Sequence, residues 1–276
     1  MQHTIRELNR CTVLQNPQYQ QYITELHSIE KFISDLGFLT FGRDYILCTD
    51  RLITLQSIIT SVELTVGSII SCCECACIAD AHTLLRKYRD DLFFYLYVAL
   101  FSEEEKGCDS KRTAVMEQNI IRWLDGKLSD LRIQEVLKAI GTSKQLKEAV
   151  NKYSLHKSFN QIGDRLNNFV HGNGMLFYNR NINTYRVGEL DRDFQSLVSD
   201  MKYITITYLF LLILCSPGFV MAFDYIDAID CGCTPHQDSI YWVAPFVEKF
   251  LKANIDLIDM NCYQFLKDRS VMQFSD

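Results

Sequence analysis

Apolar residues recur every three or four positions along most of the chain, which is the spacing of an amphipathic helix. The first such stripe runs from Pro17 to Leu36 and is ended by Gly37. The segments 50–71 and 78–101 repeat this spacing, and the second of them becomes strongly apolar towards its end. We therefore expect a long helix over each of the three segments.

Further helices are expected along the rest of the chain, and a charged, glycine-containing break at 103–107 is the clearest loop. Shorter helical patterns cover 113–123, 131–140, 143–153 and 159–170, and longer ones cover 191–215 and 240–267, with 219–230 between them. The aromatic stretch 38–47 is too short to assign. We interpret 103–157 as a helical insertion within a single α-helical domain that spans residues 1–276.

The hydrophobic period changes at 174–188. Two aromatic and β-branched runs, 175–178 and 184–187, flank the asparagine-rich segment 179–183. Such runs around an asparagine-rich turn are typical of a hairpin. The sequence therefore predicts a small β-hairpin here, inserted in an otherwise helical chain.

Composition supports the helical interpretation. The chain of 276 residues has only 12 Gly and 4 Pro, whereas a sandwich or barrel needs a turn signal every few residues. The expected fold class is therefore all-α, a helical bundle with extra helices and a small hairpin. The 11 cysteines do not suggest disulfides, because the N-terminal residues contain no apolar segment typical of a secretory signal. We expect a cytoplasmic protein with free, mostly buried thiols.

One uncharged segment, Tyr203–Phe223, is long enough to cross a bilayer. Pro217 and Gly218 interrupt it, and Lys202 and Asp224 flank it without a cluster of basic residues. A buried core helix explains these features better, so we expect no membrane contact. A membrane-anchored effector is the alternative, which fractionation would detect.

Charge is unevenly distributed. The formal net charge of −6 excludes a surface that binds nucleic acid all over. Residues 106–165, however, contain 12 Lys and Arg against 7 Asp and Glu, whereas residues 182–276 contain 7 against 13. A basic middle is compatible with a local phosphate-binding face, although charge counts alone favour ordinary solvated helix faces.

The residues best suited to chemistry lie in the stretch 164–174, Asp-Arg-Leu-Asn-Asn-Phe-Val-His-Gly-Asn-Gly. Gly172 and Gly174 should stop the helix and leave His171 at its open end. A histidine can move a proton near neutral pH, and Arg165 can hold a phosphate through two hydrogen bonds. These groups suit cleavage of RNA, in which the 2′-hydroxyl is an internal nucleophile and no metal is needed. The alternative is a helix-end histidine packed on a loop, with Arg165 paired to an acid.

An arginine followed within a few residues by His-Gly at a helix end resembles the signature of the HEPN superfamily. The resemblance covers Arg165–His171 and implies a HEPN-like helical core and a metal-independent endoribonuclease of toxin–antitoxin, abortive-infection or antiphage-defence type. It also implies a homodimer with facing motifs, with Arg165 and His171 as catalytic residues and Asn167 or Asn168 as supporting groups. The family often has a polar residue after the arginine, where this chain has Leu166. Either Asn167 takes that role, or the protein is a non-catalytic module that binds a partner protein or a nucleotide.

Other candidate residues are fewer. Arg86 and Arg89 share a helix face, where they either contact RNA phosphate or form ion pairs, for example with Asp90. The sequence predicts no cofactor and no metal, although Cys231, Cys233 and His236 could bend round a zinc ion in a loop. His82 has no companion residues and is interpreted as structural. RNA, a second copy of the chain and an antitoxin or other regulatory protein are the expected partners.

Overall fold

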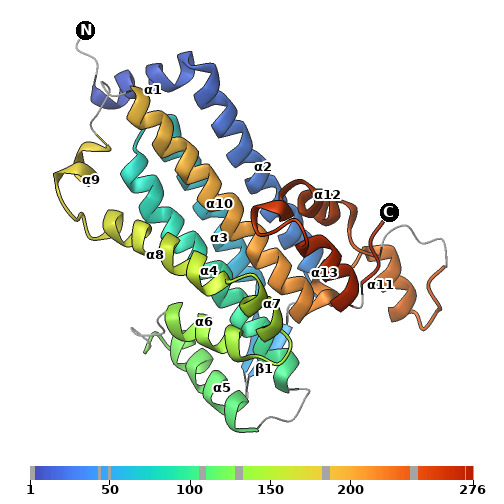
Figure 1. Ribbon diagram of the computed structural model, residues 1–276. Coiled ribbons are helices and arrows are strands. Elements are labelled where there is room, and N and C mark those ends of the chain that lie inside the picture. The colour runs from blue at the N-terminus through green and yellow to red at the C-terminus, as the bar shows by residue number, and fades with distance from the viewer. Residues whose placement is uncertain are drawn as a thin grey trace.

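The computed structural model describes residues 4–42, 45–48, 51–105, 110–127, 133–181, 187–236, 242–270 and 272–275. It confirms an all-α fold with a single small antiparallel hairpin among the described residues (Figure 1). The elements, in chain order, are α1 (Ile5–Gln15), α2 (Pro17–Thr40), β1 (Tyr45–Cys48), β2 (Arg51–Thr54), α3 (Gln56–Glu74), α4 (Ile78–Glu105), α5 (Ser110–Leu124), α6 (Ile133–Thr142), α7 (Lys147–Lys152), α8 (Leu155–Val170), α9 (Met175–Asn179), α10 (Val187–Cys215), η1 (Pro217–Val220), α11 (Phe223–Asp230), α12 (Pro245–Asn254), η2 (Ile255–Leu257) and α13 (Cys262–Arg269).

The core is built from the long helices α2, α3, α4 and α10, which run side by side through the molecule (Figure 1). Their apolar stripes face one another, so that the stripe predicted for α2 is buried from Ile23 to Leu36. Aromatic rings join the layers, as where Tyr19 of α2 stacks on Phe194 of α10 with ring centroids 5.0 Å apart. The three long helices expected near the start of the chain are therefore present.

The uncharged segment that begins at Tyr203 belongs to the buried part of α10. By length and composition, α3 and residues 189–215 of α10 could each cross a membrane, but 78% of the apolar window in α10 is buried inside the protein. Leu209, Phe210 and Leu212 are fully covered by neighbouring helices. Such burial is typical of a core helix.

The expected insertion 103–157 contains α5, α6 and α7. Helices α5 and α6 pack on α4, and α7 packs on α6 and α8 (Figure 1). Helix α8 then returns along α4, where Phe159 meets Phe93 edge to face at a centroid distance of 4.4 Å. Gly163 permits this approach, because a Cβ atom at that position would lie 2.9 Å from Nη1 of Arg89. The packing of α8 against α4 fixes the direction in which the residues after Gly163 leave the core.

Two predictions about local structure are wrong. Residues 175–179 form helix α9, so the first half of the hairpin expected at 174–188 is absent, and 182–186 lie outside the described residues. The hairpin of this fold lies instead at 45–54, where β1 and β2 pair in antiparallel register. The long helix expected at 240–267 is broken into α12, η2 and α13.

Candidate functional site

The site is built on the C-terminal end of α8. The helix ends in a Schellman motif, in which the Gly172 N–H donates to Phe169 O (3.2 Å) and the Asn173 N–H donates to Asn168 O (3.1 Å). Gly172 has φ +55°, in the left-handed region that glycine adopts without strain. The helix therefore ends just before Gly172, as predicted from the sequence, and His171 is its C-cap residue.

His171 and the two asparagines lie around this turn. The His171 side chain is exposed to solvent, and it forms no side-chain hydrogen bond with any described residue. Asn168 accepts a hydrogen bond at Oδ1 from Nδ2 of Asn173 (3.0 Å), which ties the turn together. Asn167 is half-buried and accepts the His171 N–H through its backbone carbonyl. The imidazole thus stands free on a turn that is itself well fixed.

The Arg165 side chain projects from a different side of α8 than His171 and contacts α10. Its Nη2 donates to Asp200 Oδ1 (2.5 Å) and its Nε to Asp200 Oδ2 (3.3 Å), which is a bidentate pair. Asp200 is buried, whereas the Arg165 side chain keeps 49% of its surface exposed. Burial raises the pKa of the Asp200 carboxyl, and the bond to Arg165 opposes that rise. One edge of the guanidinium is therefore held by the fold and the other is open to solvent.

A second arginine is held in the same way. Arg180, just after α9, pairs with Asp193 of α10, which lies seven residues before Asp200 and hence on the same helical face. Two carboxylates of α10 thus hold two arginines beside the end of α8.

The segment after α9 is also fixed to α4. Asn181 Oδ1 accepts hydrogen bonds from the backbone N–H groups of Ala79 (3.0 Å) and Asp80 (3.4 Å), and its Nδ2 donates to Asp80 Oδ1 (2.9 Å). Asn181 thereby satisfies amides at the start of α4 that have no partner within the helix. The loop from His171 to Asn181 is consequently anchored at both of its ends.

His82 of α4 completes this part of the structure. Its ring stacks on Phe169 (centroids 4.2 Å apart, 10° between planes), and Phe177 of α9 meets Phe169 edge to face at 4.9 Å. The ring is buried, and its Nδ1 has no hydrogen-bond partner among the described residues. Burial, together with the positive charges of Arg180 and Arg165, lowers the pKa of His82 to about 3. Both arginines therefore lie close enough to act on this imidazole.

The depressed pKa of His82 predicts a specific loss of stability in acid. The ordinary histidine pKa is 6.5, so below this pH the unfolded chain takes up a proton that the folded protein binds only near pH 3. The free energy of unfolding should fall by up to about 1.4 kcal/mol per pH unit over this window. His82→Phe keeps a ring on Phe169 and should have the shallower pH dependence when urea unfolding is measured at pH 7 and pH 5. Parallel profiles for the two proteins would contradict the assignment.

Arg86 and Arg89, the two arginines predicted to contact RNA, differ in exposure to solvent. Arg89 is buried, with Nε and Nη2 donating to Asp90 Oδ1 at 2.8 and 2.7 Å and Nη1 against Gly163. It lies in the packing between α4 and α8, where RNA does not reach it. Arg86 keeps 31% of its side chain exposed and lies 3.8 Å from Asp90. Of the two, only Arg86 remains available to a phosphate.

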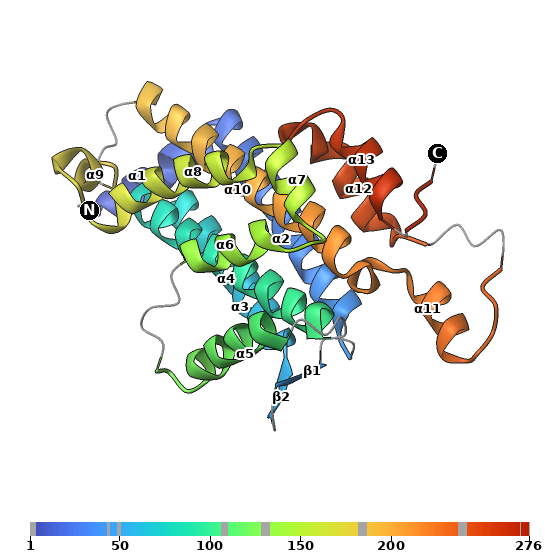
Figure 2. The same ribbon diagram turned by 60° about the horizontal axis from the view of Figure 1, so that its bottom comes forward.

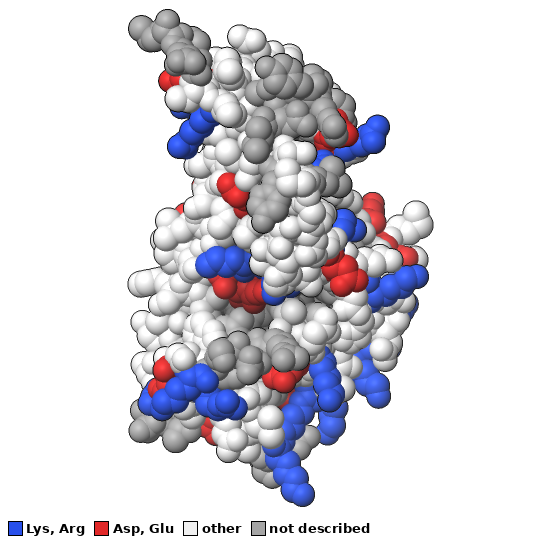
Figure 3. All heavy atoms as spheres, turned by 90° about the vertical axis from the view of Figure 1, so that its left-hand side faces the viewer, with Lys and Arg blue, Asp and Glu red and all other residues white. Residues whose placement is uncertain are grey.

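Basic side chains gather on the same side of the molecule as the end of α8. Figure 3 shows this side, with Lys and Arg concentrated over its lower part, which is formed by α5 and α6. Exposed basic residues in and next to α5, α6 and α7 are Lys111, Arg122, Lys127, Lys138, Lys144 and Lys147. Part of the excess of positive charge in the middle of the sequence is thus exposed on these helices.

No metal-binding arrangement is present in the part of the chain that the structure describes, since no three His, Cys, Asp or Glu side chains are grouped to hold an ion. Cys231, Cys233 and His236 are exposed after the end of α11. The described cysteines are free thiols.

Comparison of the chain with protein-family models, with curated proteins and with solved structures gives no significant match. The likeness to HEPN ribonucleases therefore rests on the stretch Arg165–His171 alone.

Proposed function

We propose that the protein is a metal-independent endoribonuclease whose site is the C-terminal end of α8. The observation that carries the proposal is that an exposed histidine and a half-exposed arginine lie within the last two turns of α8, whose end is fixed by its capping hydrogen bonds. His171 presents a solvent-exposed imidazole, and Arg165 presents a guanidinium that Asp200 orients but leaves half exposed.

In the proposed reaction, His171 accepts the proton of an RNA 2′-hydroxyl as its oxygen attacks the adjacent phosphorus. The bond from phosphorus to the 5′-oxygen breaks, and that oxygen takes up a proton from an imidazolium. The products are a 2′,3′-cyclic phosphate and a 5′-hydroxyl. Arg165 stabilises the negative charge that grows on the non-bridging oxygens. Asn168 keeps the turn in place through Asn173, and Asn167, one helical turn before His171, accepts the His171 N–H through its backbone carbonyl.

A homodimer suits this arrangement. Within one chain Arg165 and His171 are six residues apart, or ~240° round an ideal helix, and so point in different directions. A second copy could bring its own histidine or arginine opposite the first. The proposed interface is supported by two apolar side chains at this end of α8, Val170 with 37% and Met175 with 72% of their surfaces exposed.

The basic residues of α5 and α6 support RNA as the substrate class. Neutralisation of phosphates by Lys and Arg supplies sequence-independent affinity and makes binding weaken as salt rises. On this view the protein acts on RNA in the cytoplasm and serves growth arrest, in a toxin–antitoxin or antiphage-defence system.

Expression in a bacterial host tests this function. The parent protein should arrest growth and degrade cellular RNA, because its activity needs no added cofactor. The purified protein should cleave total RNA in the presence of EDTA. Growth at the normal rate together with intact RNA would contradict the proposal.

A second function is favoured by one observation. Both the Nε and the Nη2 of Arg165 are already bound to Asp200, as expected of an arginine whose role is structural. A non-catalytic module that binds a partner protein or a nucleotide would have this arrangement without cleavage. It predicts that RNA remains intact and that substitution of His171 changes nothing in the growth assay.

A further inference from the structure

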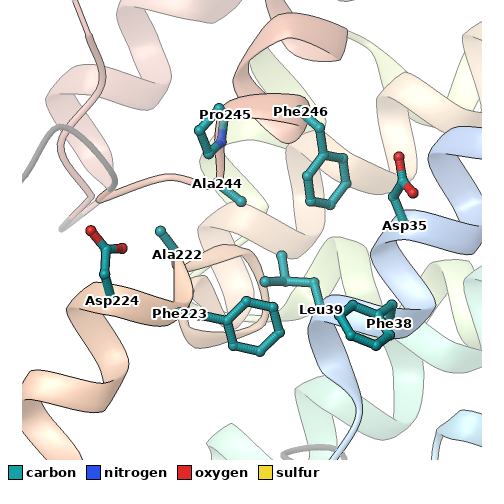
Figure 4. Close-up of a pocket in the computed structure, with 9 residues that line it drawn as sticks. All are labelled: Asp35, Phe38, Leu39, Ala222, Phe223, Asp224, Ala244, Pro245 and Phe246. Atoms are coloured by element: carbon teal, nitrogen blue, oxygen red, sulfur yellow. The ribbon is translucent and has the colours of Figure 1, made fainter.

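The opposite end of the molecule carries an apolar hollow that belongs to none of the features of the α8 site. It lies between the C-terminal end of α2, the start of α11 and the start of α12, and has a volume of about 450 Å³ (Figure 4). Its lining residues are Asp35, Phe38, Leu39, Ala222, Phe223, Asp224, Ala244, Pro245 and Phe246.

The walls of the hollow are aromatic and exposed. Phe38 has 73% and Phe223 41% of its surface exposed, although the two rings meet edge to face with centroids 6.0 Å apart. Figure 4 shows these rings along one edge of the hollow, with Phe246 on its far side. Two large aromatic side chains exposed next to each other form an apolar patch, and such a patch typically marks a surface that another molecule covers.

The hollow is a fixed part of the fold. The Ala244 N–H donates to Val220 O (2.9 Å), and Met221 pairs with Val243 in an isolated antiparallel bridge. Phe246 packs against Phe32 in the core, with centroids 5.9 Å apart. The segments before α11 and α12 are therefore joined, and the cavity between them is formed before anything binds.

Helix α11 itself is poorly covered. It has no buried residue, and it projects from the body of the protein in Figure 2. Phe223, Ile226 and Ile229 recur on one side of α11, while its aspartates at 224, 227 and 230 recur beside them. Phe223 and Ile229 are exposed and Ile226 is half-buried, so the described residues cover this apolar side of α11 only in part.

The negative charge around the hollow favours a positively charged partner. Both charged residues that line it, Asp35 and Asp224, are acidic, and Figure 4 shows them at opposite sides of the opening. Asp35 pairs with Lys31 of its own helix, but α11 adds the exposed Asp227 and Asp230 and contains no basic residue. An RNA, an anionic lipid surface or the same face of a second copy would each be repelled.

We propose that this hollow is the docking site for a basic amphipathic segment of a partner protein. A large apolar side chain of that segment enters between Phe38, Phe223 and Phe246. Its Lys or Arg residues face Asp224, Asp227 and Asp35. Apolar contact supplies the affinity, and the acidic rim sets the sign of the partner's charge. The inference is independent of the ribonuclease proposal, because no residue of the hollow belongs to the α8 site.

A binding titration tests the proposal. The probe is a fluorescein-labelled helical peptide with leucines on one face and lysines on the other, and anisotropy is measured with the full chain at physiological salt. Saturable binding is expected, with Kd raised at least about tenfold by Phe223→Ser and by Asp224→Lys. The matched controls Leu64→Ser and Asp256→Lys change an exposed apolar and an exposed acidic residue elsewhere and should leave Kd unchanged.

Each other outcome overturns the proposal. These outcomes are the absence of saturable binding, a Kd for the hollow variants equal to that of the parent, or equal affinity for a peptide with glutamates in place of the lysines. Self-association that Phe223→Ser abolishes would assign the hollow to a second copy. Sedimentation with phosphatidylglycerol vesicles that Phe223→Ser abolishes would assign it to a lipid surface. Asp224→Lys, on an exposed helix face, keeps the test valid if Phe223→Ser does not fold.

Discussion

His171→Ala should lower the rate of RNA cleavage by about 100- to 10,000-fold, the range attributed to general acid–base catalysis. The same change should alter the free energy of unfolding by no more than about 0.5 kcal/mol. The reason for this contrast is that the imidazole is exposed and forms no side-chain hydrogen bond with any described residue. Single-turnover cleavage of a labelled RNA and urea unfolding measure the two quantities.

His27→Ala is the matched control. His27 is also an exposed histidine, on the surface of α2, where its Nδ1 lies 2.9 Å from Glu30. Its replacement should leave cleavage at the parental rate. Parental cleavage by His171→Ala would show that His171 has no acid–base role. An equal loss in both variants would show that the effect does not arise at the end of α8.

Arg165→Ala should abolish cleavage and also destabilise the protein. Asp200 is only 6% exposed, and the substitution removes both guanidinium hydrogen bonds from its carboxylate. An unpaired buried charge costs about 3–5 kcal/mol; because Arg165 is half exposed, we expect about 1–3 kcal/mol here. Without the arginine the pKa of Asp200, already raised by burial, should rise further.

The sign of that pKa change gives a pH signature. A carboxyl whose folded pKa lies above its unfolded value destabilises the protein once it ionises, so the deficit of Arg165→Ala should be largest at neutral pH. It should shrink as the pH falls through the raised pKa of Asp200 and the carboxyl becomes protonated. Urea unfolding of parent and variant at several pH values measures the difference.

The double variant Arg165→Ala/Asp200→Asn separates the two roles of the arginine. A neutral amide at position 200 needs no cation, so stability should return towards the parental value while cleavage stays absent. If the double variant cleaves RNA like the parent, Arg165 serves only to neutralise Asp200. The catalytic role assigned to Arg165 would then be wrong.

The helical part of the fold was predictable because its signals are local. Apolar stripes with a period of about 3.6 residues run the length of α2, α3 and α4, and Gly172 ends α8 where the sequence indicated. The hairpin was misplaced because four apolar residues, Met175–Tyr178, fit a strand and a helical turn equally well. Tertiary contacts decide between them, since Phe177 packs on Phe169 and Asn181 caps α4.

The site was predictable only as far as one helix extends. Arg165, Asn167, Asn168 and His171 lie on a single turn-terminated segment, and their spacing can be read from the chain. Asp200 and Asp193 come from α10, and His82 from α4, so only the packing brings them to α8. The repeat of aspartates at 193 and 200 on one face of an apolar helix is the one signal that could have indicated paired cations. Arg89 was predicted to contact RNA phosphate or to form an ion pair, and it is buried against α8 and paired with Asp90.

The most direct test of the central proposal uses two RNA oligonucleotides that differ in one atom. One is all RNA, and the other carries a 2′-deoxy nucleotide at the position that the purified protein cleaves, both in EDTA. The proposed mechanism predicts that the first yields a 2′,3′-cyclic phosphate and a 5′-hydroxyl and that the second stays intact at that bond. Cleavage of both substrates at the same bond and rate would contradict it, because the nucleophile would then not be the 2′-hydroxyl.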